Sequence, residues 1–407
     1  MKKKKLLAMK MFILFTFTVL ILTVSSELIL YYSKRQEPIT SDYDKQNSGV
    51  KISDQPDNYS TASPEGEADT VMNGEQDSIK NDSIDENHSS NDISQTKDTI
   101  LVFGGDIYMS DSITRNYDTK GIQGVLSEDL LREIKQADIA MVNQEFAFST
   151  RGTPMNDKQF TFRIDPKYVQ MFQDMQIDIV TLANNHVLDF GQDALLDTFA
   201  ALENGNLKYV GAGRNSTEAK KTEYFEVDDK TIAILGASRV IPVVSWNAGE
   251  NTPGLLTTYD ASLLVEEIMA ANESSDYVIV YVHWGIEKNT YPEEYQRNLA
   301  KQYIDAGADL VVGSHPHVLQ GIEYYNGKPI VYSLGNFIFY NTINQTALLK
   351  VSIGQDNDVK LELLPCKAAN GQTFMQNDKE EVERFYREIE AISFDISFNK
   401  NGLINRD

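Results

Sequence analysis

From Thr99 onward, short apolar runs that favour β-strands alternate with segments that have the spacing of amphipathic helices. The expected strands are Thr99–Phe103, Ile139–Val142, Ile177–Leu182, Thr231–Leu235, Tyr277–Val282, Leu310–Val312 and Pro329–Tyr332. The expected helices between them are Glu128–Gln136, Gln192–Glu203, Tyr259–Asn272 and Tyr295–Ala306. Two further strands (347–353 and 359–364) and a helix (379–392) are expected near the C-terminus. This alternation predicts a layered α/β fold, and we expect one domain over residues 99–407, although the chain length also permits two.

The first 35 residues combine a basic flank with an apolar stretch. Four lysines, Lys2 to Lys5, precede the mostly apolar run Leu6–Tyr32. This pattern predicts a membrane-targeting segment whose lysines stay in the cytoplasm. A cleaved signal peptide would be cut near Val24–Ser26, which is a mediocre site, whereas an uncleaved anchor needs about 20 apolar residues. We therefore expect residues 1–35 to act as an N-terminal transmembrane anchor or signal segment, with the folded domain on the extracellular side.

Residues 36–98 hold four lysines against fifteen Asp or Glu and almost no aromatic or branched apolar side chains. Such a segment buries too little surface to offset its ordering entropy, so we expect a disordered acidic linker in which His88 is solvated. Of the net charge of −23, the part from 99 to 407 carries −18. This excess of acid argues against nucleic acid as a partner, and the lone Cys366 excludes intramolecular disulfides and Cys-rich zinc modules.

Polar side chains suited to metal binding or catalysis follow the ends of six expected strands. These residues are Asp106, Glu145, Asn184, Asn185, His186, His283, Glu287, His315, His317 and Asn336. Taken singly, each of these residues could have an ordinary structural role, such as a helix cap, a turn or a core histidine. Because ligands bind beyond the carboxyl ends of strands in α/β sheets, their joint placement favours one shared cation site. Histidine, carboxylate and amide ligands without thiolate suit Zn, Mn or Fe.

The same motifs, in the same order, resemble those of the CapA/PgsA family of capsule and poly-γ-glutamate synthesis proteins. The motifs are Gly105-Asp106, Asn143-x-Glu145, Asn184-Asn185-His186-x-x-Asp189-x-Gly191, His283-Trp284-Gly285-x-Glu287, Gly313-x-His315-Pro316-His317-x-x-Gln320 and Ser333-Leu334-Gly335-Asn336-Phe337. The resemblance covers residues 99–345. It implies an α-β-β-α sandwich of the metallophosphoesterase-like (calcineurin-like) type over 99–407, with 99–345 as its motif core.

The wider likeness to calcineurin-like phosphoesterases implies roles for these residues. It assigns a first divalent metal to Asp106 and His317, a second to Asn185, His283 and His315, and a bridging position to Glu145. His186 would be the uncoordinated acid that protonates the leaving oxygen, and the supporting residues would be Asn184, Glu287 and Asn336. The Asp-x-His signature of that superfamily reads Asp106-Ile107-Tyr108 here. One ligand of the first metal is therefore replaced, and one or two ions are implied.

Three functions remain open from the sequence. The first is a membrane-anchored extracytoplasmic protein needed to make or export an anionic polymer, such as capsule or poly-γ-glutamate, together with membrane-bound synthase subunits. The second is an extracytoplasmic metal-dependent phosphoesterase, for which the substrate would be a phosphoester. The third is a non-catalytic, metal-stabilised binding or scaffold module, which the Tyr108 replacement suggests. The sequence therefore also leaves open whether the chain is an enzyme, namely a metal-dependent hydrolase.

Overall fold

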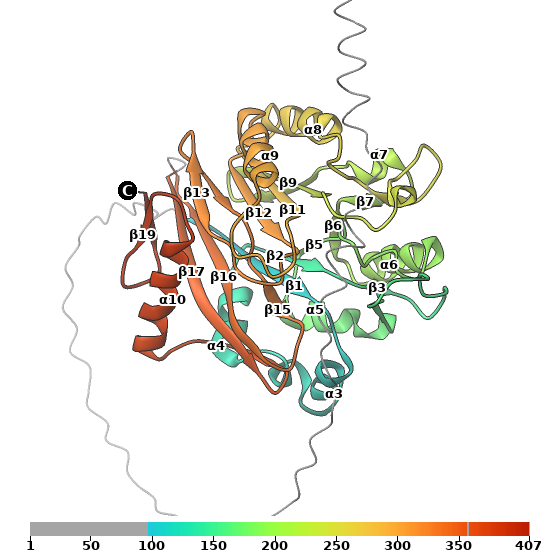
Figure 1. Cartoon of the computed structure of the whole chain (residues 1–407), viewed down its shortest axis with the longest axis horizontal. Helices are drawn as coiled ribbons and strands as arrows, with labels where there is room; N and C mark the ends of the chain where they lie inside the picture. Colours follow the sequence, from blue (N-terminus) through green and yellow to red (C-terminus); the bar gives the residue numbers. More distant parts are fainter. Residues whose placement is uncertain (1–96, 356–357, 407) are drawn as a thin grey trace, which may run out of the picture. The chain divides into compact units, whose positions relative to one another are not determined.

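The computed structural model describes residues 97–355 and 358–406 of the chain (Figure 1). The expected anchor at 1–35, the expected linker up to residue 96 and His88 lie outside the described residues. Among the residues that are described, no helix is both long enough and apolar enough to cross a membrane.

Eight strands form a mixed sheet in the order β18-β17-β16-β1-β2-β5-β6, with β15 also paired to β1. Their bounds are β1 (Thr99–Ile107), β2 (Ile139–Gln144), β5 (Ile179–Thr181), β6 (Lys208–Val210), β15 (Asn336–Ile338), β16 (Ile343–Ile353), β17 (Val359–Ala369) and β18 (Gln372–Met375). Strands β1, β2, β5 and β6 run parallel, whereas β16, β17 and β18 continue the sheet in antiparallel fashion. The parallel half needs long crossover connections, which the intervening helices supply.

A second sheet holds six strands in the order β13-β14-β12-β11-β9-β8. Their bounds are β8 (Glu223–Val227), β9 (Lys230–Ser238), β11 (Tyr277–His283), β12 (Leu310–Ser314), β13 (Ile322–Tyr325) and β14 (Lys328–Val331). The four central strands are parallel, and the two edge strands, β8 and β13, are antiparallel to their neighbours.

Successive residues of each central strand point to opposite faces, and both faces are buried. Leu101 and Phe103 of β1 share one core with Ile279 of β11, so this core lies between the two sheets. Val102 instead joins the outer core of the first sheet, while Val280 joins the outer core of the second. Burial on both faces explains why these strands read as continuous apolar runs in the sequence.

Helices cover both outer cores, which gives four layers in the order helix, sheet, sheet, helix (Figure 1). Those on the first sheet are α3 (Asp111–Lys120), α4 (Glu128–Lys135), α5 (Val169–Met175) and α6 (Gln192–Asn204). Those on the second sheet are α8 (Ser262–Asn272) and α9 (Glu294–Asp305). The prediction of a layered α/β fold is therefore confirmed, with both sheets of mixed direction.

The remaining strands and α-helices lie in the connections and at the C-terminal end. They are β3 (Ala147–Phe148), β4 (Arg163–Ile164), β7 (Ala212–Gly213), β10 (Gly254–Leu255), α7 (Ser216–Ala219), α10 (Lys379–Ala391), β19 (Ile396–Phe398) and β20 (Ile404–Arg406). Helix α10 buries Phe385, Tyr386 and Ile389 against the core between the sheets, so its opposite, charged face is turned outward.

The ends of several strands meet where the chain places its polar motifs. Asp106 of β1 lies in register with Asn143 of β2 and with Asn336 of β15. The hydroxyl of Tyr281 in the second sheet donates to the carbonyl of Gly104 in the first at 2.9 Å. Residues from separate sheets are thereby held at one end of the sandwich.

Candidate metal centre

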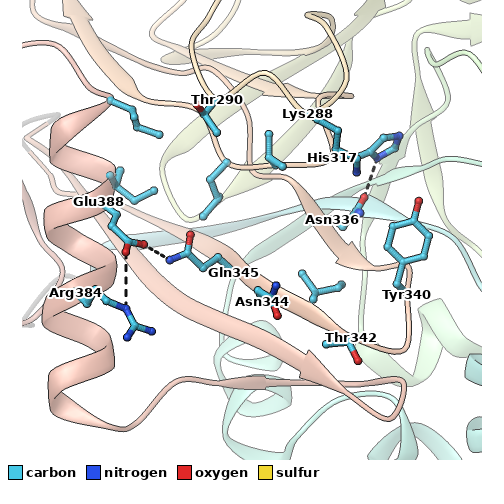
Figure 2. Close-up of a pocket in the computed structure, with 15 residues that line it drawn as sticks. Lys288, Thr290, His317, Asn336, Tyr340, Thr342, Asn344, Gln345, Arg384 and Glu388 are labelled. Atoms are coloured by element: carbon cyan, nitrogen blue, oxygen red, sulfur yellow. Dashed lines mark hydrogen bonds and ion pairs between the residues drawn. The ribbon is translucent and has the colours of Figure 1, made fainter. Parts of the chain in front are cut away.

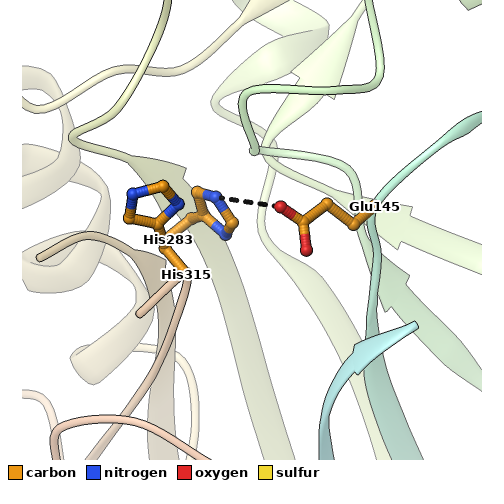
Figure 3. A group of neighbouring side chains, drawn as sticks. All are labelled: Glu145, His283 and His315. Carbon is orange, nitrogen blue, oxygen red and sulfur yellow. Dashed lines mark ion pairs between the residues drawn. The ribbon is translucent and has the colours of Figure 1, made fainter. Parts of the chain in front are cut away.

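Five side chains with metal-binding atoms gather at this end of the sandwich, four of them buried and one, His317, partly buried. They form two groups, one of Glu145, His283 and His315 and the other of Asp106, Glu145 and His317. Within each group the ligand atoms lie within 4.8 Å of one another. Figure 3 shows the first group, in which Glu145 faces the two histidines from the opposite side. Glu145 is common to both groups.

The carboxylate of Glu145 lacks the partners that a buried charge needs. The residue is 0% exposed, and among the described residues neither of its carboxylate oxygens has a hydrogen-bond partner. The nearest basic atoms are Nε2 of His283 at 3.7 Å and Nε2 of His317 at 3.9 Å. Burial, together with repulsion from Asp106, raises the pKa of Glu145 well above its usual value. Such a carboxylate is costly unless a cation balances it, so the donor set fits a divalent metal.

Asp106 and His317 are held in place by amide side chains. The Nδ2 of Asn143 donates to Oδ1 of Asp106 at 2.8 Å. The Nδ1 of His317 lies 2.8 Å from Oδ1 of Asn336 and 3.3 Å from Oδ2 of Asp106. Burial disfavours a positive charge on His317 and lowers its pKa. The negative charges of Glu145 and Asp106 have the larger effect and raise the pKa of His317 to about 9. Without a metal, this imidazolium is the only cation within contact distance of Asp106 among the described groups.

His283 and His315, which form a group with Glu145, stay neutral. Nε2 of His283 lies 2.9 Å from Oδ1 of Asn185, while its Nδ1 lies 3.1 Å from the hydroxyl of Ser314. Nδ1 of His315 is buried, and no hydrogen-bond partner for it occurs in the described part of the chain. Burial, and then the other histidines, lower the pKa of both residues well below the usual value. A neutral imidazole is the form that binds a metal.

The backbone at the two loop histidines adopts an uncommon conformation. His315 has φ of 98° and His317 has φ of 56°, both in the left-handed region that non-glycine residues rarely enter. Such strain costs about 1–3 kcal/mol per residue and is found mainly at functional sites. The loop Ser314–His317 is thus held so that both imidazoles face Glu145.

His186 lies outside both groups. Its Nδ1 is 2.7 Å from Oδ2 of Asp189 and 3.2 Å from Nζ of Lys158, and its ring stacks on Phe162 at 4.1 Å between centroids. Burial is the main cause that lowers the pKa of His186 to about 4. The contact with Asp189 fixes the orientation of the His186 ring through Nδ1. The other ring nitrogen, Nε2, takes no part in this contact.

Lys158 is a site residue that the sequence did not reveal. Besides His186, its ammonium contacts the carbonyl of Asn185 and the carboxylate of Asp189. Its side chain is only 13% exposed, and burial lowers its pKa. Lys158 lies in the connection between β3 and β4 and does not follow the end of a predicted strand, so no local pattern marks it.

The other predicted residues take different places. The Nδ2 of Asn184 donates to the Asn143 side chain at 3.0 Å and to the Gln144 carbonyl at 2.7 Å, which braces the chain beside Glu145. Glu287 is exposed and belongs to neither ligand group. Tyr108 stacks on Phe162 at 3.9 Å, and burial raises its pKa, which keeps the phenol protonated and a poor ligand.

Removal of the Lys158 charge is expected to raise the pKa of His186 above about 4, because the ammonium disfavours a second positive charge beside it. The variant Lys158→Met keeps an unbranched side chain of similar length and removes the charge together with the ammonium's contacts to Asn185 and Asp189. The pKa is measured by NMR titration of the imidazole in metal-free protein, with Lys167→Met as the control, since Lys167 lies on the surface away from His186. An unchanged or lower pKa in Lys158→Met would contradict this arrangement.

Comparisons with known proteins give a consistent result. Residues 100–341 match the family described as Bacterial capsule synthesis protein PGA_cap. The chain is 34% identical over 270 residues to the PGA biosynthesis protein CapA of Bacillus subtilis (strain 168), which covers 65% of this chain and 70% of that protein. It is 27% identical over 277 residues to a Mycobacterium tuberculosis (strain CDC 1551 / Oshkosh) protein named "Probable polyglutamine synthesis accessory protein MT0602", covering 63% of this chain and 72% of that one.

Among solved structures, a novel phosphatase from Mycoplasma pneumoniae aligns with a TM-score of 0.44 and 14% identity, over 72% of this chain and 99% of that chain. The range matched by the family, residues 100–341, contains every member of the two ligand groups.

Proposed function

Because the chain belongs to the bacterial capsule synthesis protein family, we propose that it works outside the cytoplasm in the synthesis or export of an anionic capsule polymer such as poly-γ-glutamate. The proposed arrangement has residues 1–35 as a membrane anchor, the domain from 99 to 407 on the extracellular side, and membrane-bound synthase subunits as partners. The basic and apolar pattern of the first 35 residues supports the anchor.

The observation that carries the proposal is the buried, unpartnered carboxylate of Glu145, which is shared by two ligand groups. We propose that Asp106, Glu145 and His317 hold one divalent metal and that His283, His315 and Glu145, with Asn185, hold a second. The metal supplies a positive, Lewis-acidic centre for carboxylate or phosphate oxygens. A domain of net charge −18 needs such a centre to attract a polyanion.

The protein's own side chains prepare this centre. Asn143 and Asn336 orient Asp106 and His317 through hydrogen bonds of 2.8 Å each. Asp189 holds the ring of His186 through Nδ1 at 2.7 Å, so Nε2 is the nitrogen that would exchange a proton with a bound group. The supporting roles proposed for Asn184 and Glu287 differ, because Asn184 braces the backbone whereas Glu287 contributes only its negative charge from the surface.

The variant His315→Ala tests the proposal. We expect it to bind far less divalent metal than the wild type, measured by elemental analysis of the purified protein, and to abolish cell-associated polymer when it replaces the native gene. The matched control is Lys328→Ala in β14, which removes a partly exposed ion pair with Asp309. Wild-type polymer levels in cells that carry a metal-depleted His315→Ala protein would refute the proposal.

A metal-dependent phosphoesterase is the second candidate, and the specific observation in its favour is His186, which stays outside both ligand groups beside Asp189. The variant His186→Ala is expected to abolish hydrolysis of phosphomonoesters or diesters while it leaves metal content unchanged. An unaltered rate of hydrolysis would exclude His186 as the acid that protonates the leaving oxygen. A metal-loaded wild type without any turnover would favour the binding or scaffold role instead.

A further inference from the structure

A cleft of about 810 Å³ leads from the metal centre to helix α10 (Figure 2). His317, Asn336 and Tyr340 lie at the end nearest the metal centre, and Arg384 and Glu388 of α10 lie at the other end. The family match ends at residue 341, so the far wall is built by a part of the chain beyond the matched range. The proposed metal centre makes no use of this wall.

The cleft carries two cationic side chains on a domain that is strongly acidic. Apart from the proposed ligand His317, the charged residues of its lining are Lys288 and Arg384, against the single acid Glu388. The Arg384 side chain is 53% exposed, with Nη2 at 2.6 Å from Glu381 and Nε at 3.8 Å from Glu388. Since Glu381 and Glu388 hold its guanidinium in place while leaving half of it open, Arg384 presents oriented donors to the cleft.

Cations at both ends suit an extended ligand better than a small one. Lys288 is exposed at the end nearest the metal centre, where its ammonium lies 5.9 Å from the ring centroid of Tyr340. Besides Lys288 and Arg384, the lining holds polar side chains (Thr290, Asn344 and Gln345) and apolar ones (Leu319 and Ile389). Amide and hydroxyl groups can pair with amide bonds, and the apolar side chains can pack on methylene groups.

We propose that this cleft binds an extended chain with regularly spaced carboxylates, amide linkages and methylene groups. One carboxylate reaches the metal centre past His317, while others pair with Lys288 and with Arg384. This inference rests on the proposed function and adds the place where the polymer binds and the residues that contact it. It assigns α10 as a binding element that selects a polymer over a single anion, because a small anion at the metal centre does not reach Arg384.

The variant Arg384→Ala tests the cleft, and Arg387→Ala is its matched control. Arg387 lies on the same helix, is 66% exposed and pairs with Glu383 at 3.8 Å, but does not line the cleft. The Kd of a labelled γ-linked glutamate oligomer is measured by fluorescence anisotropy with the metal-loaded full chain in detergent. We expect Arg384→Ala to weaken binding about fivefold, as for loss of one half-exposed ion pair, and Arg387→Ala to leave it unchanged. Free glutamate should show no difference between the three proteins.

Several results would overturn the inference. Equal oligomer affinity in wild type and Arg384→Ala would exclude the cleft. An equal loss of oligomer affinity in Arg387→Ala would show a general effect of surface charge. If polyphosphate binds more tightly than the glutamate oligomer and its binding depends on Arg384, the ligand is a polyphosphate and not a polycarboxylate. If Arg384→Ala binds normally while His315→Ala still abolishes cellular polymer, the cleft inference fails and the proposed function stands. If His315→Ala leaves cellular polymer intact, the proposed function itself fails.

Discussion

Glu145→Gln is expected to bind far less divalent metal than the wild type and, once both proteins are metal-free, to be the more stable of the two. The wild-type carboxylate is fully buried and has no hydrogen-bond partner among the described residues, so without a metal its desolvation cost is offset only in part, chiefly by the His317 imidazolium at 3.9 Å. The amide keeps the shape and removes the charge. We expect a gain of about 2 kcal/mol in the free energy of unfolding of the metal-free protein.

The same variant has an expected pH dependence. Because the pKa of Glu145 is raised in the folded state, its protonated form contributes stability below the unfolded pKa of about 4.3, and this contribution is lost as pH rises through the folded value. The advantage of Glu145→Gln should therefore grow as pH rises above about 4.3. Urea unfolding with a chelator at acidic and at neutral pH measures it.

The control for metal content is Glu362→Gln. Glu362 lies in β17, and burial likewise raises its pKa, but it belongs to neither ligand group. We expect Glu362→Gln to retain the metal of the wild type. A metal-free wild type that is more stable than Glu145→Gln at neutral pH would contradict the assignment of Glu145 as a cation-dependent carboxylate.

Gly105→Ala is expected to lower the free energy of unfolding by about 3 kcal/mol, because the added carbon has no space. A Cβ on Gly105 in β1 would lie 1.9 Å from the backbone carbonyl oxygen of Gly335, the residue that precedes β15. The next residue, Asp106, donates its amide to that same carbonyl at 2.8 Å. The strands must therefore separate, which moves Asp106 and should also lower metal occupancy.

The control for this substitution is Gly354→Ala. The nearest described atoms to a Cβ on Gly354 lie at 3.4 Å or more, which is ordinary contact. We expect its stability to remain within about 0.5 kcal/mol of the wild type. Denaturant unfolding of the two variants measures the difference, and equal stability of Gly105→Ala and wild type would show that β1 and β15 are not in this close contact.

The sequence predicted the central strands and the amphipathic helices well. Strands such as β11 (Tyr277–His283) are buried on both faces, so they read as continuous apolar runs. Helix α3 (Asp111–Lys120) was not predicted, because Ile113 is its single buried residue and a polar helix lacks the apolar period. The ends of some strands also differ from the predicted bounds. For example, β16 begins at Ile343 rather than at residue 347, because pairing with β17 extends it through polar residues.

The candidate site was partly predictable. The residue types that follow strand ends predicted that Asp106, Glu145 and the ligand histidines lie together. In the structure they form two groups that share Glu145, and the ligand atoms of each group lie within 4.8 Å of one another. Glu287 was expected beside them, but Gly285, with φ of 98°, turns the chain after β11, and Glu287 remains exposed. Lys158 was not predicted, since it reaches Asp189 from a connection that shows no periodic pattern.

The sequence by itself determined the alternation of the central strands with helices, the chemistry of the side chains at the strand ends and the family to which the motifs point, because these depend on local composition and spacing. Only the tertiary structure decided that Glu145 is shared by two ligand groups, that its oxygens are left unpartnered in the described chain, and that α10 closes a cleft beside His317. These features arise from packing between two sheets and a distant helix. Contacts over such long sequence separations leave no periodic signal in the chain.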